Sequence, residues 1–295
     1  MNQTMAIKDY LINKLRRVLG IIDILAALDQ VLKDQKRELI KEILNQIKPG
    51  SIVECCINDV ELLAPIEPLQ VYQHCVFPNA EQKLNFLIEN HCAEWLCSHI
   101  NYGDTVLDIG AAFGVISFPL AKAVGKKGHI YAFEPAKNTQ DTLQKILSLN
   151  HISNITVVTQ AISDKSGIAE FIEYSQDNES SWASDTSTLA SDNNIDEYKK
   201  FTTYQVSVIT LDEYIAKNAI EPSAIKMDIE GFEFYALQGG KQTLEKYLPY
   251  LCIDIHADVK TGKSSLVEIE PFLQSLGYSL TMEEHTLYGI PPEKT

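Results

Sequence analysis

The chain is short of positive charge, Cys-x-x-Cys pairs and long apolar runs. Its 25 Lys and Arg face 40 Asp and Glu, a formal net charge of −15. We expect no nucleic-acid or anionic-membrane partner, because both need clustered basic residues. The six cysteines form no Cys-x-x-Cys pair and the seven histidines show no ligand-like spacing, which argues against structural zinc. No signal peptide or membrane-length apolar run is apparent, so we expect a cytoplasmic protein with reduced thiols.

The first 78 residues carry no chemical motif. Helical spacing of apolar residues predicts a helix over 4–47, and Pro49-Gly50 ends it. Residues 51–64 have the pattern of a hairpin that turns at Asn58-Asp59. An irregular linker is predicted at the prolines that follow, Pro65, Pro68 and Pro78. We interpret 1–78 as a helical and hairpin extension, a cap or a dimerisation element, and a homodimer is one expectation.

Residues 79–295 have the pattern of a second, larger domain. A helix is expected over 81–99. Strands are then predicted at 105–109, 129–133, 155–159, 204–209, 223–228 and 249–255, and helices at 114–124, 137–149, 211–217, 232–246 and 264–276. A strand pair at 278–282 and 286–290 closes the chain. Such alternation predicts an α/β fold, with a mostly parallel sheet covered by helices on both faces. The polar stretch 174–203, with its lone Trp182, is either a mobile surface loop or a lid.

A glycine turn after the first of these strands indicates a nucleoside pocket. The strand ends at Asp108 and Ile109 and is followed by Gly110-Ala111-Ala112-Phe113-Gly114. The next strand ends in Glu134-Pro135, close to the spacing of about 20 residues expected for a ribose-binding carboxylate. The third leads into Gln160-Ala161-Ile162. Each signal alone is weak, but their order places all of them at strand ends, where open α/β sheets bind ligands.

The turn favours a cofactor without a pyrophosphate. Ala112 stands where a dinucleotide site needs its middle glycine, and Phe113 would crowd the phosphates, which disfavours an NAD-dependent oxidoreductase. S-adenosylmethionine fits better. Its carboxylate can lie at the helix start near Phe113-Gly114, and Asp108 can hold its ammonium, directly or through water. Glu134 can accept both ribose hydroxyls, and the segment Gln160-Ala161-Ile162 can hold adenine.

A second set of charged residues follows near the end of the chain. Lys226, Asp228 and Glu230 share one strand face by period-two alternation, and the next strand ends at Asp254 and His256. Buried charges are costly without a partner or a task. They are either a structural salt bridge or catalytic groups, with Asp228 and His256 as candidate bases and Lys226 as an orienting cation. A divalent metal at Asp228, Asp254 and His256 is an open alternative, although we expect no metal.

The chain resembles the FkbM family of S-adenosylmethionine-dependent methyltransferases over about residues 80–290. The matching segments are Val106–Gly114, Ala132–Pro135, Gln160–Gly167, Thr210–Glu213, Ile225–Gly231 and Phe272–Tyr278. Glu89 resembles an acid that family members carry before the first strand. The family often has asparagine at the position of Ala112 and glutamate at that of Asp254.

The resemblance implies a class I methyltransferase fold, usually with O-methylation of sugars or natural-product hydroxyls. We therefore expect a small-molecule acceptor. Methylation of an amide or peptide nitrogen, and a non-catalytic scaffold, stay open as alternatives. Asp228 is a candidate on both the cofactor and the acceptor side. Contacts with the acceptor are expected from residues 175–200 and from the N-terminal part.

Overall fold

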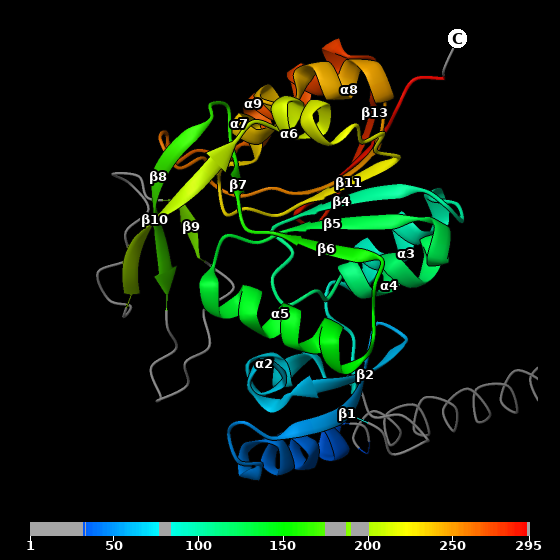
Figure 1. Cartoon of the computed structure of the whole chain (residues 1–295), viewed down its shortest axis with the longest axis vertical. Coiled ribbons are helices and arrows are strands. Elements are labelled where there is room, and N and C mark those ends of the chain that lie inside the picture. The colour runs from blue at the N-terminus through cyan, green and yellow to red at the C-terminus, as the bar shows by residue number, and fades with distance from the viewer. Residues whose placement is uncertain (1–31, 33, 77–83, 175–186, 190–200, 294–295) are drawn as a thin grey trace, which may run out of the picture.

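A seven-stranded sheet forms the centre of the computed structural model (Figure 1). The structure describes residues 32, 34–76, 84–174, 187–189 and 201–293. The strands of the sheet, in spatial order, are β13 (Ser279–Glu283), β14 (Thr286–Ile290), β12 (Tyr250–Asp254), β11 (Ala224–Met227), β4 (Thr105–Ile109), β5 (His129–Phe133) and β6 (Ile155–Val158). The last five run parallel, and β14 is antiparallel to both β12 and β13. The predicted parallel sheet and closing strand pair are confirmed.

Helices cover both faces of this sheet. One face carries α3 (Asn90–His99), α4 (Ser117–Val124) and α5 (Lys137–Leu149), while the other carries α6 (Leu211–Asn218), α7 (Glu233–Gln238), α8 (Lys241–Tyr247) and α9 (Leu266–Ser275) (Figure 1). Alternate residues of each strand enter different cores: Val106 packs with the α3–α5 side and Leu107 with the α6–α9 side. This two-sided burial explains the near-continuous apolar strands. No described helix has the length and apolarity needed to cross a bilayer.

The register of the sheet brings the strand ends into line. Ile109 lies opposite Phe133 on one side and Met227 on the other, and Phe133 lies opposite Val158. Met227 in turn lies opposite Ile253. The residues that follow these strands therefore gather at one edge, at the point where the chain crosses over from β4 to opposite sides of the sheet.

The N-terminal hairpin is confirmed. β1 (Ile52–Ile57) and β2 (Val60–Pro65) pair antiparallel, and Asn58 and Asp59 both have positive φ, at 45° and 63°, as a tight hairpin turn requires. The described part of the predicted linker is instead α2 (Ile66–Val71), followed by the 3-10 turn η1 (Tyr72–Cys75), and Pro78 lies outside the described residues. Pro65 precedes this helix and Pro68 lies in its first turn, where a missing N–H costs no helix bond. The predicted first helix is present at 34–46, and residues 4–31 of that prediction lie outside the described part.

The predicted helix over 81–99 is only partly correct. Residues 84–86 form β3 (Leu84–Phe86), which pairs parallel with β1, and α3 begins at Asn90 after Glu89 in a left-handed conformation. Apolar spacing at Leu84, Leu87 and Ile88 is compatible with a helix, but the open edge of the hairpin takes up the backbone groups of this segment as a third strand.

A second, smaller sheet lies beside the first. It contains β7 (Ala161–Ile162), β10 (Phe201–Ile209), β8 (Gly167–Tyr174) and β9 (Thr188–Leu189), in that order (Figure 1). The strand predicted at 204–209 therefore belongs to this sheet and begins at Phe201. Of the predicted loop or lid, the structure describes residues 174, 187–189 and 201–203, and Trp182 lies outside the described residues. The predicted helix 232–246 divides into α7 and α8 at Gly239-Gly240.

Candidate active site

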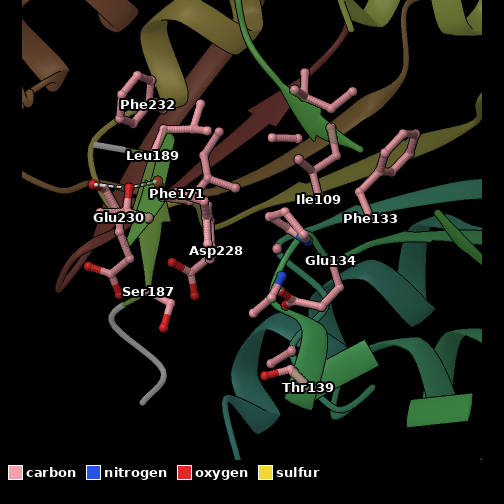
Figure 2. A pocket seen from close by; sticks show the side chains of 18 of the residues that line it. Ile109, Phe133, Glu134, Thr139, Phe171, Ser187, Leu189, Asp228, Glu230 and Phe232 are labelled. Carbon is pink, nitrogen blue, oxygen red and sulfur yellow. Dashed lines mark hydrogen bonds between the residues drawn. The ribbon is translucent and has the colours of Figure 1, made fainter. Parts of the chain in front are cut away.

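A cleft opens at the carboxyl ends of β4, β5, β6 and β11, between the two sheets (Figure 2). It encloses about 1140 Å³, counting the part that opens to solvent. Predicted site residues on its walls are Glu89, Gly110, Glu134, Pro135, Gln160, Ala161, Ile162, Lys226 and Asp228. Predicted residues that do not line it are Asp108, Ala111, Phe113, Gly114, Asp254 and His256. The strand ends thus meet as expected, while much of the glycine turn faces inward.

Gly110 joins the cleft to the sheet. Its φ is 80°, and a Cβ at this position would overlap the backbone carbonyl oxygen of Asp228. The backbone N–H groups of Gly110 and Ala111 both donate to the Phe133 carbonyl, at 3.0 and 2.9 Å. These two amides therefore fasten β4 to β5 and are not available to hold a ligand.

The second half of the turn differs from the prediction. Phe113 is fully buried against the ring of Tyr72, with ring centroids 5.4 Å apart. At Gly114, φ is 100° and a Cβ would lie 2.6 Å from the Phe118 ring. Helix α4 starts at Ser117, not at Gly114 as predicted, and the Phe118 N–H of its first turn donates to the Gly114 carbonyl at 3.0 Å. Large apolar neighbours draw these residues into the core, and the side chains on the cleft wall are Ala112 and Val115 instead.

Asp108 is buried and does not line the cleft. Its side chain is completely buried, accepts a hydrogen bond from Ser117 Oγ at 2.6 Å and lies 4.0 Å from Lys226 Nζ. Burial raises the pKa of this carboxyl, and Lys226 and Ser117 oppose that shift. Because Asp108 does not line the cleft, the geometry disfavours a direct contact with a cofactor ammonium and is compatible with the predicted contact through water. The side chains that it contacts in the structure are Ser117 and Lys226.

Glu134 presents a carboxylate to the cleft. Its side chain is largely buried, and Oε1 accepts the backbone N–H of Ala136 at 2.7 Å. Burial raises the pKa of Glu134 to about 7, although hydrogen bonds from the Ala136 and Ala112 backbone lower it. On the neighbouring wall, the Gln160 amide donates to Ser207 Oγ of β10 at 3.1 Å. Glu134, predicted for the ribose, and Gln160, predicted for adenine, therefore both line the cleft.

Lys226 is surrounded by acids. Its ammonium donates to the Gly110 carbonyl at 3.1 Å and lies 3.5 Å from Asp228 Oδ2 and 3.7 Å from Glu89 Oε2. Burial alone would lower the pKa of Lys226, but these carboxylates and Asp108 raise it well above the ordinary value. Lys226 therefore stays charged, which suits an orienting cation and excludes a general base. The salt bridge that the sequence left open is present, and it forms part of the cleft wall.

His256 forms a second acidic group with residues after β11. Its Nδ1 donates to Glu233 Oε1 at 2.9 Å, and its Nε2 lies 3.7 Å from Asp228 Oδ1 and 3.8 Å from Glu230 Oε2. Burial lowers the pKa of His256, but the Glu233 hydrogen bond and the three carboxylates outweigh it and raise the pKa to about 10. A base must be unprotonated, so this environment disfavours the predicted role of His256 as a base.

The candidate metal set needs a correction. Ligand atoms of Asp228, Glu230 and His256 lie within 4.8 Å of one another, whereas Asp254 falls into a different group with Glu89 and Cys92. Asp254 is turned away because its Oδ1 accepts a hydrogen bond from Thr286 Oγ1 at 2.6 Å on the antiparallel strand β14. β11 ends at Met227 and Glu230 has a φ of 55°, so the predicted strand alternation does not extend to Glu230.

Several residues of the site were not identified from the sequence. Glu233 is one: it does not line the cleft but accepts a hydrogen bond from His256, and the signal for it was an acid in the first turn of a helix that follows a strand. The others come from the extension, from α5, from the small sheet and from the segment after β11: Tyr72, Thr139, Phe171, Ser187, Leu189 and Phe232. The two regions expected to supply acceptor contacts therefore both reach the cleft, through Tyr72 and through residues 187–189.

The order of the central sheet, its antiparallel end and the acidic cleft at its crossover point define a class I methyltransferase fold. Residues 108–280 match the model of the methyltransferase FkbM domain. Because this match covers more than half of the chain, the protein belongs to the FkbM family of S-adenosylmethionine-dependent methyltransferases.

Solved structures with a similar fold share only low sequence identity with this chain. Methyltransferase FkbM from Methylobacillus flagellatus KT shares 18% identity over 67% of this chain, with a TM-score of 0.45, and the match spans 50% of that chain. A SAM-dependent methyltransferase from Aquifex aeolicus shares 16% identity over 67% of this chain and 88% of that one, with a TM-score of 0.37. Aeropyrum pernix fibrillarin, in complex with S-adenosyl-L-methionine, shares 12% identity over 84% and 86%, with a TM-score of 0.43. No curated protein matches this chain.

Proposed function

We propose that this chain transfers the methyl group of S-adenosylmethionine to a hydroxyl oxygen of a small molecule, such as a sugar or natural product. The supporting observation is the arrangement of carboxylates in the cleft. Figure 2 shows Asp228 and Glu230 on one wall, and Glu134 and Thr139 across from them. This arrangement supports the use of one carboxylate for the ribose of the donor and of another for the acceptor.

The chemistry of the cleft fits the donor. When bound, S-adenosylmethionine supplies a methyl group on a positively charged sulfur, which leaves with the C–S electron pair as the acceptor oxygen bonds to the methyl carbon. Glu134 is suited to accept the ribose hydroxyls. The excess of acid around Lys226 matches the positive charge of a sulfonium and an ammonium. Apolar side chains suited to adenine flank the ribose wall, namely Phe133, Ile162 and Phe171.

Asp228 is the proposed base. As the hydroxyl attacks, its proton passes to the Asp228 carboxylate, which lines the cleft and is held on one side by Lys226 and on the other by His256. A positioned base contributes typically about 10²–10⁴-fold to the rate. Holding the two reactants in line contributes more, up to roughly 7–11 kcal/mol of the barrier.

The test is methyl transfer by the full chain. Purified protein is incubated with S-adenosylmethionine carrying a labelled methyl group and with a panel of hydroxylated small molecules. Mass spectrometry then detects the transferred methyl group and NMR assigns the atom that carries it. We expect label on oxygen, lost on Asp228→Asn and retained on Asp141→Asn, an exposed acid of α5.

Other outcomes would each correct a different part of the proposal. Label on nitrogen would replace O-methylation by N-methylation. Unchanged turnover by Asp228→Asn would remove the base. Failure of the wild-type chain to bind S-adenosylhomocysteine, measured by calorimetry, would leave a non-catalytic scaffold.

A further inference from the structure

Side chains of Asp228, Glu230 and His256 face one another at distances too long for hydrogen bonds between them. His256 Nε2 lies 3.7 Å from one carboxylate and 3.8 Å from the other, longer than a hydrogen bond. Two atoms that bind the same Mg²⁺ or Mn²⁺ ion at about 2.1 Å are about 3–4 Å apart. The three side chains therefore surround a space that suits one cation.

The imidazole is oriented as in a metal site. Its other nitrogen, Nδ1, is fixed by a 2.9 Å hydrogen bond to Glu233, a side chain with no exposed surface. A carboxylate behind a ligating histidine is the usual support of such a site, because it fixes the ring and directs Nε2 at the ion. Glu233 Oε2 is also buried and has no hydrogen-bond partner among the described residues.

The other group of possible metal ligands is already occupied by contacts with neighbouring side chains. Glu89, Cys92 and Asp254 also bring ligand atoms together, but the Lys226 ammonium already lies 3.7 Å from Glu89 Oε2. Cys92 Sγ contacts His91 Nε2 at 3.3 Å, and Asp254 accepts from Thr286. A cation is thus built into that group, whereas Lys226 reaches only Asp228 in the group around His256.

We propose that Asp228, Glu230 and His256 bind one divalent cation of the Mg²⁺ or Mn²⁺ type, with Glu233 as the positioning residue behind His256. Oxygen ligands with one imidazole suit such ions. The cation takes the place of the proton on His256, as metal binding to histidine requires. Because Asp228 and Glu230 line the cleft, the remaining coordination positions face the acceptor side.

The site also specifies a class of acceptor. This step rests on the proposed function. An ion with three protein ligands has room for two oxygens of one molecule, so the favoured acceptors carry neighbouring hydroxyls or a hydroxyl beside a carbonyl. Such chelation brings one hydroxyl to the ion and lowers its pKa, so that the hydroxyl loses its proton more readily as it attacks.

Direct binding of Mn²⁺ to the full chain tests the site without any acceptor. Electron paramagnetic resonance measures free Mn²⁺, and calorimetry measures its stoichiometry and affinity, with Mg²⁺ as the competing ion. We expect one Mn²⁺ per chain. Glu230→Gln and His256→Asn should each weaken binding about tenfold or more, and Glu233→Gln about tenfold through loss of orientation. Glu170→Gln, an exposed acid of β8, should bind as the wild type does.

S-adenosylhomocysteine binding, measured on the same samples, shows that each variant is folded and tests the proposed function separately. The inference is overturned if the wild type binds no Mn²⁺ while it still binds S-adenosylhomocysteine. It is equally overturned if Mn²⁺ binds with the same affinity to Glu230→Gln and His256→Asn. Loss of S-adenosylhomocysteine binding by a wild type that holds Mn²⁺ would contradict the donor assignment and leave the metal site standing.

Discussion

The backbones of Gly110 and Asp228 approach so closely that a Cβ on Gly110 would overlap the Asp228 carbonyl oxygen. This contact joins the end of β4, the proposed donor side of the cleft, to the end of β11, the proposed acceptor side. Gly110→Ala should therefore move the two walls apart. We expect a loss of about 3 kcal/mol or more in the free energy of unfolding, measured with urea, together with loss of S-adenosylhomocysteine binding.

Gly262→Ala is the matched control for this variant. Gly262 also has positive φ, at 67°, but nothing lies within 4 Å of its Cβ position. It should lose only about 1 kcal/mol, the cost of the strained conformation, and should bind ligand normally. Equal destabilisation by the two substitutions would mean that conformation, and not the contact with Asp228, makes Gly110 necessary.

The main sheet could be predicted from the sequence because its signals are local and repeated. Strands buried on both faces are continuous apolar runs, and each is followed by a helix, so β4, β5 and β6 were found within one residue. Their order along the chain then places Glu134 and Gln160 at one edge without any knowledge of long-range contacts.

The parts of the fold and of the site that the sequence did not predict depend on contacts between distant segments. β3 is a strand because β1 offers it an open edge, and β8 pairs with β10 more than thirty residues later. Phe113 looks like a ligand contact in the sequence, but the Tyr72 ring from the extension covers it. Glu230, and not Asp254, lies with Asp228 and His256, because Asp254 accepts a hydrogen bond from Thr286 on β14. None of these partners can be identified from local spacing.

The raised pKa of Glu134 predicts how binding of the donor depends on pH. The folded-state pKa is about 7, above the ordinary value, so the folded chain holds a proton that the unfolded chain releases. The stability of the free protein should therefore fall as pH rises from about 4.5 to 7. In the proposed function the ionised Glu134 carboxylate accepts both ribose hydroxyls. Affinity for S-adenosylhomocysteine should therefore rise as Glu134 ionises, by up to about tenfold between pH 6 and pH 8.

Calorimetry across this pH range checks the prediction. Glu134→Gln should bind more weakly and lose most of the pH dependence. Glu89→Gln is the control, because the pKa of Glu89 is also raised to about 7, through burial, while its carboxylate faces Lys226. If Glu134→Gln keeps the full pH dependence and Glu89→Gln abolishes it, the titrating group is Glu89.

Lys226 should matter for stability as well as for the site. Lys226→Met leaves Glu89, Asp108 and Asp228 without their shared cation in a buried place. Breaking a buried ion pair by removing one partner typically costs about 3–5 kcal/mol, and we expect a loss of that size at neutral pH in urea unfolding. The loss should shrink as pH falls below about 7, because burial favours protonation of Glu89 and Asp108.

An exposed lysine gives the comparison for this variant. Lys241 pairs with Glu245 across one turn of α8 at 3.7 Å, with both side chains about half exposed. Lys241→Met should change the free energy of unfolding by no more than about 0.5 kcal/mol. Similar effects of the two substitutions would show that the acids around Lys226 do not depend on it for compensation.

Asn150 should determine how firmly the N-terminal extension is held. Its side chain accepts the Leu63 backbone N–H and donates to the Leu63 carbonyl, both at 2.8 Å, and so acts as a strand partner on the open edge of β2. Asn150→Ala leaves both backbone groups unpaired, which should cost about 1–3 kcal/mol in urea unfolding. Asn138→Ala, at an exposed position near the start of α5, should stay within about 0.5 kcal/mol of the wild type.

Because Tyr72 carries the extension to the cleft wall, Asn150→Ala should also weaken S-adenosylhomocysteine binding. Equal stability of the two variants would show that the hydrophobic contacts of the extension, and not this pair of hydrogen bonds, fix it to α5.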